Sequence, residues 1–181
     1  GETLYPVRGR QCSAEQMPAL ADKFPTYKEF GSASIFEVYG KALGQAIHYE
    51  ATNFSNSVLI NSGTGQLSLR PLPNEAQISP INSAIADDFD QDGITDLLVA
   101  GNLFGSEVET GRADAGKGLF LRGDGQGSFS PVPPHQSGLW LPLDVRALLP
   151  VQTKAGPIIF AGSNNAPLQA VGRAMKKPMP K

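Results

Sequence analysis

A sequence pattern that recurs after roughly 60 residues is the strongest constraint on the fold of this 181-residue chain. Residues 63–68 and 125–130 share a glycine-rich pattern, in which Gly63 corresponds to Gly125. Residues 97–101 and 158–162 share an apolar run that ends in Ala-Gly, in which Leu97 corresponds to Ile158. The first pair of segments is separated by 62 residues and the second by 61. Because the two separations differ by a single residue, we interpret the chain as an array of one repeated structural unit.

Short apolar runs follow one another from about residue 57 onward, separated by Gly, Asn, Asp and Pro. Such runs predict short β-strands joined by turns. The predicted strands lie at 58–60, 85–86, 97–100, 119–121, 158–161 and 168–171. The high content of turn residues, 20 Gly and 15 Pro, also argues against a helical bundle or a coiled coil.

The repeat and the strands together predict a mainly β fold that forms a partial β-propeller. Four antiparallel strands within about 50–60 residues make one propeller blade. We therefore expect half a blade at 57–72, a full blade at 80–133 and a partial blade at 139–171. The blades together occupy residues 51–175, and residues 176–181 are expected to form a disordered tail.

Residues 1–50 have a different pattern, with apolar residues at helical spacing and three Ser/Thr-x-x-Glu/Gln capping boxes. The boxes begin at Ser13, Thr26 and Ser34 and predict two or three short helices between about residues 14 and 40, the first ended by Pro25. Helices this short are unstable alone, so we expect this helical N-terminal insertion to pack on the blades.

Four aspartates within nine residues form the most specific chemical motif of the chain. They stand at positions 1, 3, 5 and 9 of a loop that a glycine turns at position 6. Alternating carboxylates and one main-chain carbonyl can converge on Ca²⁺, which takes 6–8 oxygen ligands. The predicted ligands are the carboxylates of Asp88, Asp90, Asp92 and Asp96 and the carbonyl of Ile94.

The same loop has two alternative interpretations. An EF-hand carries Glu at position 12, where this sequence has Val99 in a predicted strand, so the loop is not an EF-hand. An Asp/Gly-rich turn that binds nothing is the second alternative, because these residues are common in turns. Four carboxylates repel one another without a cation, which favours calcium. Residues 149–157, one repeat later, have no carboxylate and predict a metal-free blade.

The loop and the hairpin that follows it, Gly-Asp-Gly-x-Gly-x-Phe at 123–129, resemble the FG-GAP/VCBS repeat of integrin-α-like β-propellers. The resemblance implies calcium ligation by the five residues just named. Residues 8–27 are similar to an insertion in large VCBS-repeat proteins of Bacteroidetes-type bacteria, related to those with an ASPIC/UnbV domain. Family propellers have about seven blades, so we expect this chain to be a C-terminal-type segment of a longer protein.

Several further residues have both a functional and a structural interpretation. Arg122-Gly123-Asp124 is either an integrin-type adhesion tripeptide or a hairpin turn, and we favour the turn. The glycines at 123–127 are a turn rather than a phosphate cradle, because no helix is predicted after them. Trp140 either packs between blades, which we favour, or stacks on sugars. We expect His48 to be packed, His135 to be exposed and Cys12 to be inert.

Charge and hydropathy exclude several classes of partner. The net charge of −2 provides no basic field for nucleic acid, and no apolar run reaches the ~18 residues of a membrane span. Cys12 is the single cysteine, which excludes an internal disulfide framework. The first residues lack a signal-peptide core, so we expect the signal of an exported protein to lie outside this chain.

We therefore predict a non-enzymatic, extracytoplasmic propeller segment (secreted, periplasmic or cell-surface) in which calcium is structural. Its predicted role is cell-surface adhesion, or the binding of a protein or a glycan. The alternatives are a carbohydrate-active or phosphoester enzyme on a propeller, and a purely structural scaffold in a longer chain. Open strand edges also invite pairing, so an edge-to-edge homo-oligomer is a candidate state.

Overall fold

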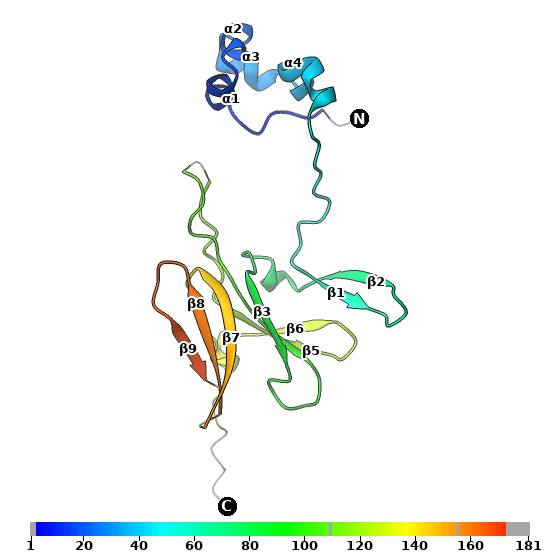
Figure 1. The fold of residues 1–181 in the computed structure, drawn as a ribbon, viewed down its shortest axis with the longest axis vertical. Helices are drawn as coiled ribbons and strands as arrows, with labels where there is room; N and C mark the ends of the chain where they lie inside the picture. Colours follow the sequence, from blue (N-terminus) through cyan, green and yellow to red (C-terminus); the bar gives the residue numbers. More distant parts are fainter. Residues whose placement is uncertain (1–2, 109, 155, 173–181) are drawn as a thin grey trace, which may run out of the picture. The chain divides into compact units, whose positions relative to one another are not determined.

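A computed structural model describes residues 3–108, 110–154 and 156–172 (Figure 1). The chain divides into two units, Gly1–Thr52 and Asn53–Lys181, and each has a hydrophobic core of its own. The sequence pattern places this boundary at residue 50. The expectation that the helical segment packs on the β-sheets stays a prediction, and the expected tail at 176–181 lies outside the described residues.

The first unit is a group of short helices around a small apolar core. Leu20, Phe30, Ala33 and Val38 are buried together, and the ring of Phe24 packs edge-on against that of Phe30 at a centroid distance of 5.7 Å. The helices thus bury their apolar side chains against one another. The elements are α1 (Arg10–Gln16), α2 (Ala19–Lys23), α3 (Tyr27–Ser32), α4 (Ile35–Tyr39) and the 3-10 helix η1 (Gly40–Gln45).

Two of the three predicted capping boxes are confirmed. Thr26 Oγ1 accepts from the backbone N–H of Glu29 at 3.2 Å, and the Glu29 carboxylate accepts from Thr26 N at 3.0 Å. Ser34 and Glu37 form the same reciprocal pair at 3.2 and 2.7 Å. Each box satisfies two donors that a helix start would otherwise leave without partners, which explains why α3 and α4 begin where they do.

The third box, at Ser13, is wrong. Helix α1 begins at Arg10, so Ser13 lies inside the helix, and the N-cap is Gly9, without a side-chain cap. Arg10, the first residue of the helix, donates from Nε to the carbonyl of Phe24 at 2.5 Å and from Nη2 to that of Ala21 at 3.2 Å. These contacts are long-range and leave no local sequence signal.

The second unit contains three antiparallel sheets, which confirms the mainly β class and the predicted strands (Figure 1). Among the described residues the sheets are separate and none closes on itself. The strands are β1 (Ser57–Asn61) and β2 (Leu67–Pro71) in the first sheet, β3 (Ser83–Asp87), β4 (Asp96–Ala100), β5 (Leu119–Gly123) and β6 (Phe129–Val132) in the second, and β7 (Val145–Thr153), β8 (Gly156–Ser163) and β9 (Gln169–Gly172) in the third. Two short helices, η2 (Asn74–Ala76) and α5 (Pro134–Ser137), lie in the connections.

The two faces of the β3–β6 sheet belong to two different hydrophobic clusters. Val99 of β4 packs in a cluster with Val58 of β1, whereas its neighbour Ala100 packs in a cluster with Ala161 of β8. Val99 thus faces the β1–β2 sheet, which precedes its own sheet in the chain. In β8 the residue that faces the preceding sheet, β3–β6, is Ala161. The apolar match in the sequence pairs Val99 with Phe160 instead. The structure corrects it by one position, which matters because such a shift exchanges the two faces of a strand.

A second correction concerns the connection of the third sheet. The sequence pattern makes residues 149–157 the counterpart of the acidic loop. In the structure β7 runs to Thr153 and β8 starts at Gly156, and the two pair to the end of this hairpin. In the described part of the third sheet, pairing between β7 and β8 thus extends to Thr153 and Gly156, where the second sheet has the open loop between β3 and β4.

Candidate metal centre

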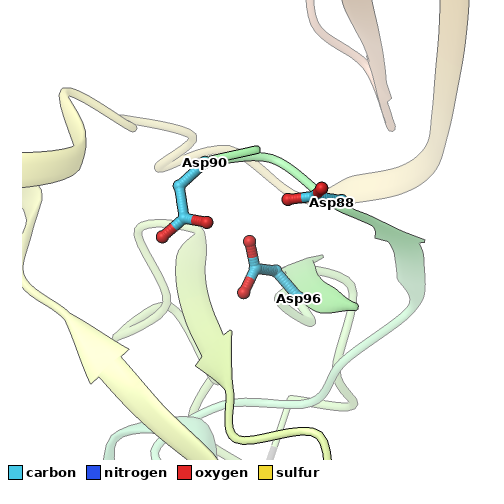
Figure 2. A group of neighbouring side chains, drawn as sticks. All are labelled: Asp88, Asp90 and Asp96. Atoms are coloured by element: carbon cyan, nitrogen blue, oxygen red, sulfur yellow. The ribbon is translucent and has the colours of Figure 1, made fainter. Parts of the chain in front are cut away.

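The loop between β3 and β4 brings three aspartates together (Figure 2). Asp88, Asp90 and Asp96 each offer a carboxylate oxygen, and these oxygens all lie within 4.8 Å of one another. Figure 2 shows the side chains pointing toward a common centre from the loop and from the start of β4. In the described part of the chain, this is the one group of three or more His, Cys, Asp or Glu side chains arranged in this way.

Asp88 holds the turn of the loop. Its Oδ1 accepts from the backbone N–H of Asp92 at 3.1 Å, and its Oδ2 accepts from that of Gly93 at 2.9 Å. Two residues of the turn have left-handed backbone, Gln91 with φ 65° and Gly93 with φ 86°. The glycine at position 6 of the motif suits this backbone, because glycine adopts the left-handed region without the strain that other residues meet there.

Asp96 is fully buried and ties the loop to the neighbouring strand. Its Oδ2 accepts from Phe89 N at 3.2 Å, and its Oδ1 accepts from Gly123 N in β5 at 2.9 Å. A Cβ atom on Gly123 would overlap the carbonyl oxygen of Thr95, so only glycine fits there. The sequence pattern marks Gly123 as part of a turn and gives no sign of this close approach.

Asp90 completes the group and has one oxygen without a partner. Its Oδ2 accepts from Nε of Arg122 at 2.8 Å. Its Oδ1 is buried and has no hydrogen-bond partner among the described residues. A buried carboxylate oxygen without a partner costs free energy, and a hard cation between the three carboxylates would remove that cost. The group therefore fits a divalent cation with oxygen ligands.

The other two predicted ligands, Asp92 and the carbonyl of Ile94, are not among the three converging carboxylates. The side chain of Asp92 is not part of the group of three, and its Oδ1 accepts from the N–H of Ile94 at 2.8 Å within the same turn. Ligation by Asp92 and by the carbonyl of Ile94 stays a prediction. Three carboxylates supply part of the 6–8 oxygens that Ca²⁺ takes, and a carbonyl, a further carboxylate or waters would supply the rest.

Both charged side chains of the Arg122-Gly123-Asp124 tripeptide have intramolecular partners. Arg122 pairs with Asp90, and Asp124 Oδ1 accepts from the N–H groups of Ser128 at 2.9 Å and Gln126 at 2.7 Å. The hydrogen bonds from Ser128 and then Gln126 lower the pKa of the exposed Asp124 carboxyl. Arg122 and Gly123 thus end β5, and Asp124 begins the β5–β6 turn, in agreement with the turn interpretation.

The glycines of this turn have the conformation of a hairpin. Gly125 and Gly127 have φ values of 73° and 83°, and β6 begins directly afterwards at Phe129. A phosphate cradle needs the N-terminus of a helix at this point, and a strand follows instead. The hairpin interpretation is confirmed.

The preferred interpretation of Trp140 is wrong. Its side chain is 57% exposed, while its neighbours Leu139 and Leu141 are buried. Leu139 and Leu141 belong to a buried apolar cluster of which Trp140 is not a member. The ammonium of Lys117 lies 5.9 Å from the centroid of the indole ring. The alternative, an exposed stacking surface, is the one compatible with this position.

The two histidines and the cysteine lie apart from the acidic loop in the sequence. His48 is exposed in the stretch that follows η1, so the expected packing is wrong. His135 in α5 is exposed, as predicted, and Cys12 is half-buried within α1.

The second unit contains a mostly apolar cavity of about 420 Å³ near Ala100 and Leu119. The polar side chains of its lining are Glu75, Ser79 and Lys117. Among the described residues its lining offers one carboxylate, whereas glycoside hydrolysis, one form of the enzyme alternative, uses a pair.

No family model matches this chain, and neither the curated proteins nor the solved structures compared with it include a match. The resemblance to the FG-GAP/VCBS repeat therefore stays a proposal. Within the described residues, none of the helices has the length and apolar character needed to cross a membrane.

Proposed function

We propose that this chain is a partial β-propeller of the FG-GAP/VCBS type whose middle blade, β3 to β6, binds a structural Ca²⁺ ion. The observation that carries the proposal is the convergence of Asp88, Asp90 and Asp96 around a buried carboxylate oxygen without a partner. The antiparallel order β3-β4-β5-β6, between a two-stranded and a three-stranded sheet, is what a blade within an array requires.

Calcium would act on the stability of the loop rather than in a reaction. The cation would cancel the repulsion between three neighbouring carboxylates. Asp96 already contacts β5 through Gly123, and Asp90 contacts it through Arg122. A cation bound by both aspartates would therefore fix the loop and the β5 strand as one rigid end of the blade. Extracellular modules bind calcium with dissociation constants of ~10⁻⁴–10⁻³ M, which suits an extracytoplasmic protein.

On this rigid scaffold the proposed role is non-enzymatic binding of a protein or a glycan, in cell-surface adhesion. The exposed indole of Trp140 supports a glycan surface, because flat aromatic rings stack on sugars. An enzyme built on the propeller and a pure scaffold within a longer chain are the second and third candidates. A separate proposal is that two copies of the chain pair through their open strand edges, and light scattering with and without Ca²⁺ tests it.

Thermal unfolding with and without calcium tests the proposal. We expect EDTA to lower the Tm of the second unit and excess Ca²⁺ to restore it, and equal Tm values would contradict a structural calcium. Glycan arrays and pull-downs, each in Ca²⁺ and in EDTA, test the binding role. Trp140→Ala should abolish retention of a glycan ligand, while the exposed Leu168→Ala serves as the control.

A further inference from the structure

We propose that Arg122 is a built-in counter-charge of the acidic loop: it stabilises Asp90 in the absence of a cation and weakens the binding of Ca²⁺. This inference rests on the proposed calcium site, and it assigns a regulatory residue to that site. In this proposal the guanidinium of Arg122 competes with Ca²⁺ for Asp90 and so raises the calcium concentration at which the loop becomes rigid.

The position of Arg122 is the first observation. The residue lies in β5, paired with Ser130 of β6, and it reaches across to an aspartate 32 residues earlier in the chain. Its Nε donates to Oδ2 of Asp90 at 2.8 Å, which leaves Oδ1 as the oxygen without a partner. Arg122 therefore neutralises one carboxylate of the group while the other two carboxylates accept only backbone N–H groups in the described structure.

The charges give the sign of the effect. The carboxylates of Asp88, Asp90 and Asp96 and the one guanidinium together carry a formal charge of −2, and Asp92 adds a further negative charge to the loop. A cation held by Asp90 would lie near the guanidinium, and the two positive charges would repel each other. Removing the arginine charge therefore destabilises the cation-free loop and strengthens cation binding.

The repeat shows that the hairpin itself does not require an arginine. With Gly63 and Gly125 aligned, the counterpart of Arg122 is Ile60, in the matching hairpin of the first sheet. Ile60 packs against Gly127 and is half-buried, whereas the side chain of Arg122 is 54% exposed. The same backbone thus accommodates an aliphatic residue, and the charge at Arg122 is specific to the hairpin beside the acidic loop.

The substitution Arg122→Gln tests the inference, because it removes the charge from an exposed side chain and keeps a polar group of similar length. Calorimetric titration of Ca²⁺ into the full chain should give a dissociation constant about three- to tenfold lower than that of the wild type. The Tm in EDTA should fall, and the rise in Tm on adding Ca²⁺ should increase. Arg122→Lys, which keeps the charge, should bind Ca²⁺ as the wild type does.

Arg112→Gln is the matched control. Arg112 forms a comparably exposed ion pair with Asp114 at 2.8 Å, away from the acidic loop in the sequence, and its loss should leave calcium binding unchanged. Equal or weaker calcium binding by Arg122→Gln would overturn the inference and make Arg122 a positioning residue or a bystander. If neither wild type nor Arg122→Gln binds Ca²⁺, the calcium proposal fails as well. Wild-type binding without a gain in the variant refutes the role of Arg122 alone.

Discussion

Oδ1 of Asp96 accepts a hydrogen bond of 2.9 Å from the backbone nitrogen of Gly123. This contact joins the last carboxylate of the acidic loop to β5, and it depends on the absence of a side chain at Gly123. A Cβ atom there would lie far inside van der Waals contact with the carbonyl oxygen of Thr95. The candidate metal centre and the pairing of β5 with β6 thus share one glycine, since Gly123 also pairs with Phe129.

Gly123→Ala should destabilise the second unit by about 2–4 kcal/mol, because the backbone of β5 must move away from Thr95 and leave Asp96 with one donor fewer. Urea unfolding followed by tryptophan fluorescence measures this, since Trp140 is the single tryptophan and lies in that unit. Gly105→Ala is the control, because nothing lies within 4 Å of its Cβ position. Equal free energies of unfolding for the two variants would contradict the close approach.

Asn102, which lies just after β4, makes several hydrogen bonds from a buried position, and its loss should be costly. It is fully buried, donates to the carbonyls of Gly116, Leu143 and Pro142 at 3.0, 3.1 and 3.3 Å, and accepts from Ser79 Oγ at 2.6 Å. Asn102→Ala leaves these groups without their partner in a buried site. We expect a loss of about 2–4 kcal/mol in the free energy of unfolding.

The repeat provides the control for Asn102. Its counterpart in the repeat is Asn164, which lies just after β8 and is exposed, so Asn164→Ala should change the free energy of unfolding by less than about 0.5 kcal/mol. The same urea titration with Trp140 fluorescence compares the two variants. If both substitutions cost the same, the hydrogen bonds of Asn102 do not hold the β6–β7 connection in place.

Asp124 should make the β5–β6 turn sensitive to acid. The N–H groups of Ser128 and Gln126 lower the pKa of its carboxyl in the folded state, so the ionised form stabilises the turn. That contribution is complete above the unfolded pKa of about 3.8 and is lost as pH falls through the lower folded pKa. The Tm advantage of wild type over Asp124→Asn should therefore shrink between about pH 5 and pH 2. An advantage that is constant across this range would contradict the lowered pKa.

Local sequence signals are enough for the strands, for two capping boxes and for the spacing of the acidic loop. Asp88 and Asp90 lie close in sequence, and the capping partners Thr26 and Glu29 are three residues apart, so the geometry follows from the local backbone. Repeat spacing also predicts which strands pair within a sheet. The sequence could not show that Val99 of β4 corresponds to Ala161 of β8 and not to Phe160. A short apolar run matches almost equally well when it is shifted by one residue, although that shift moves every side chain to the other face of the strand.

The contacts that complete the candidate site could not be predicted in this way. Arg122 and Gly123 reach Asp90 and Asp96 across 32 and 27 residues, and such contacts depend on the register between strands. The exposure of Trp140 could not be predicted either. In the sequence an indole between two leucines resembles a core residue, and only the structure shows that the leucines are buried and the indole is not.

Calorimetric titration of Ca²⁺ into the EDTA-treated, buffer-exchanged full chain is the decisive test of a calcium site at the β3–β4 loop. We expect one site with a dissociation constant of ~10⁻⁴–10⁻³ M, weakened at least about tenfold by Asp88→Asn and unchanged by Asp114→Asn in the exposed ion pair with Arg112. A wild-type chain that gives no binding heat, or an Asp88→Asn variant that binds as tightly as wild type, would contradict a calcium site at the β3–β4 loop.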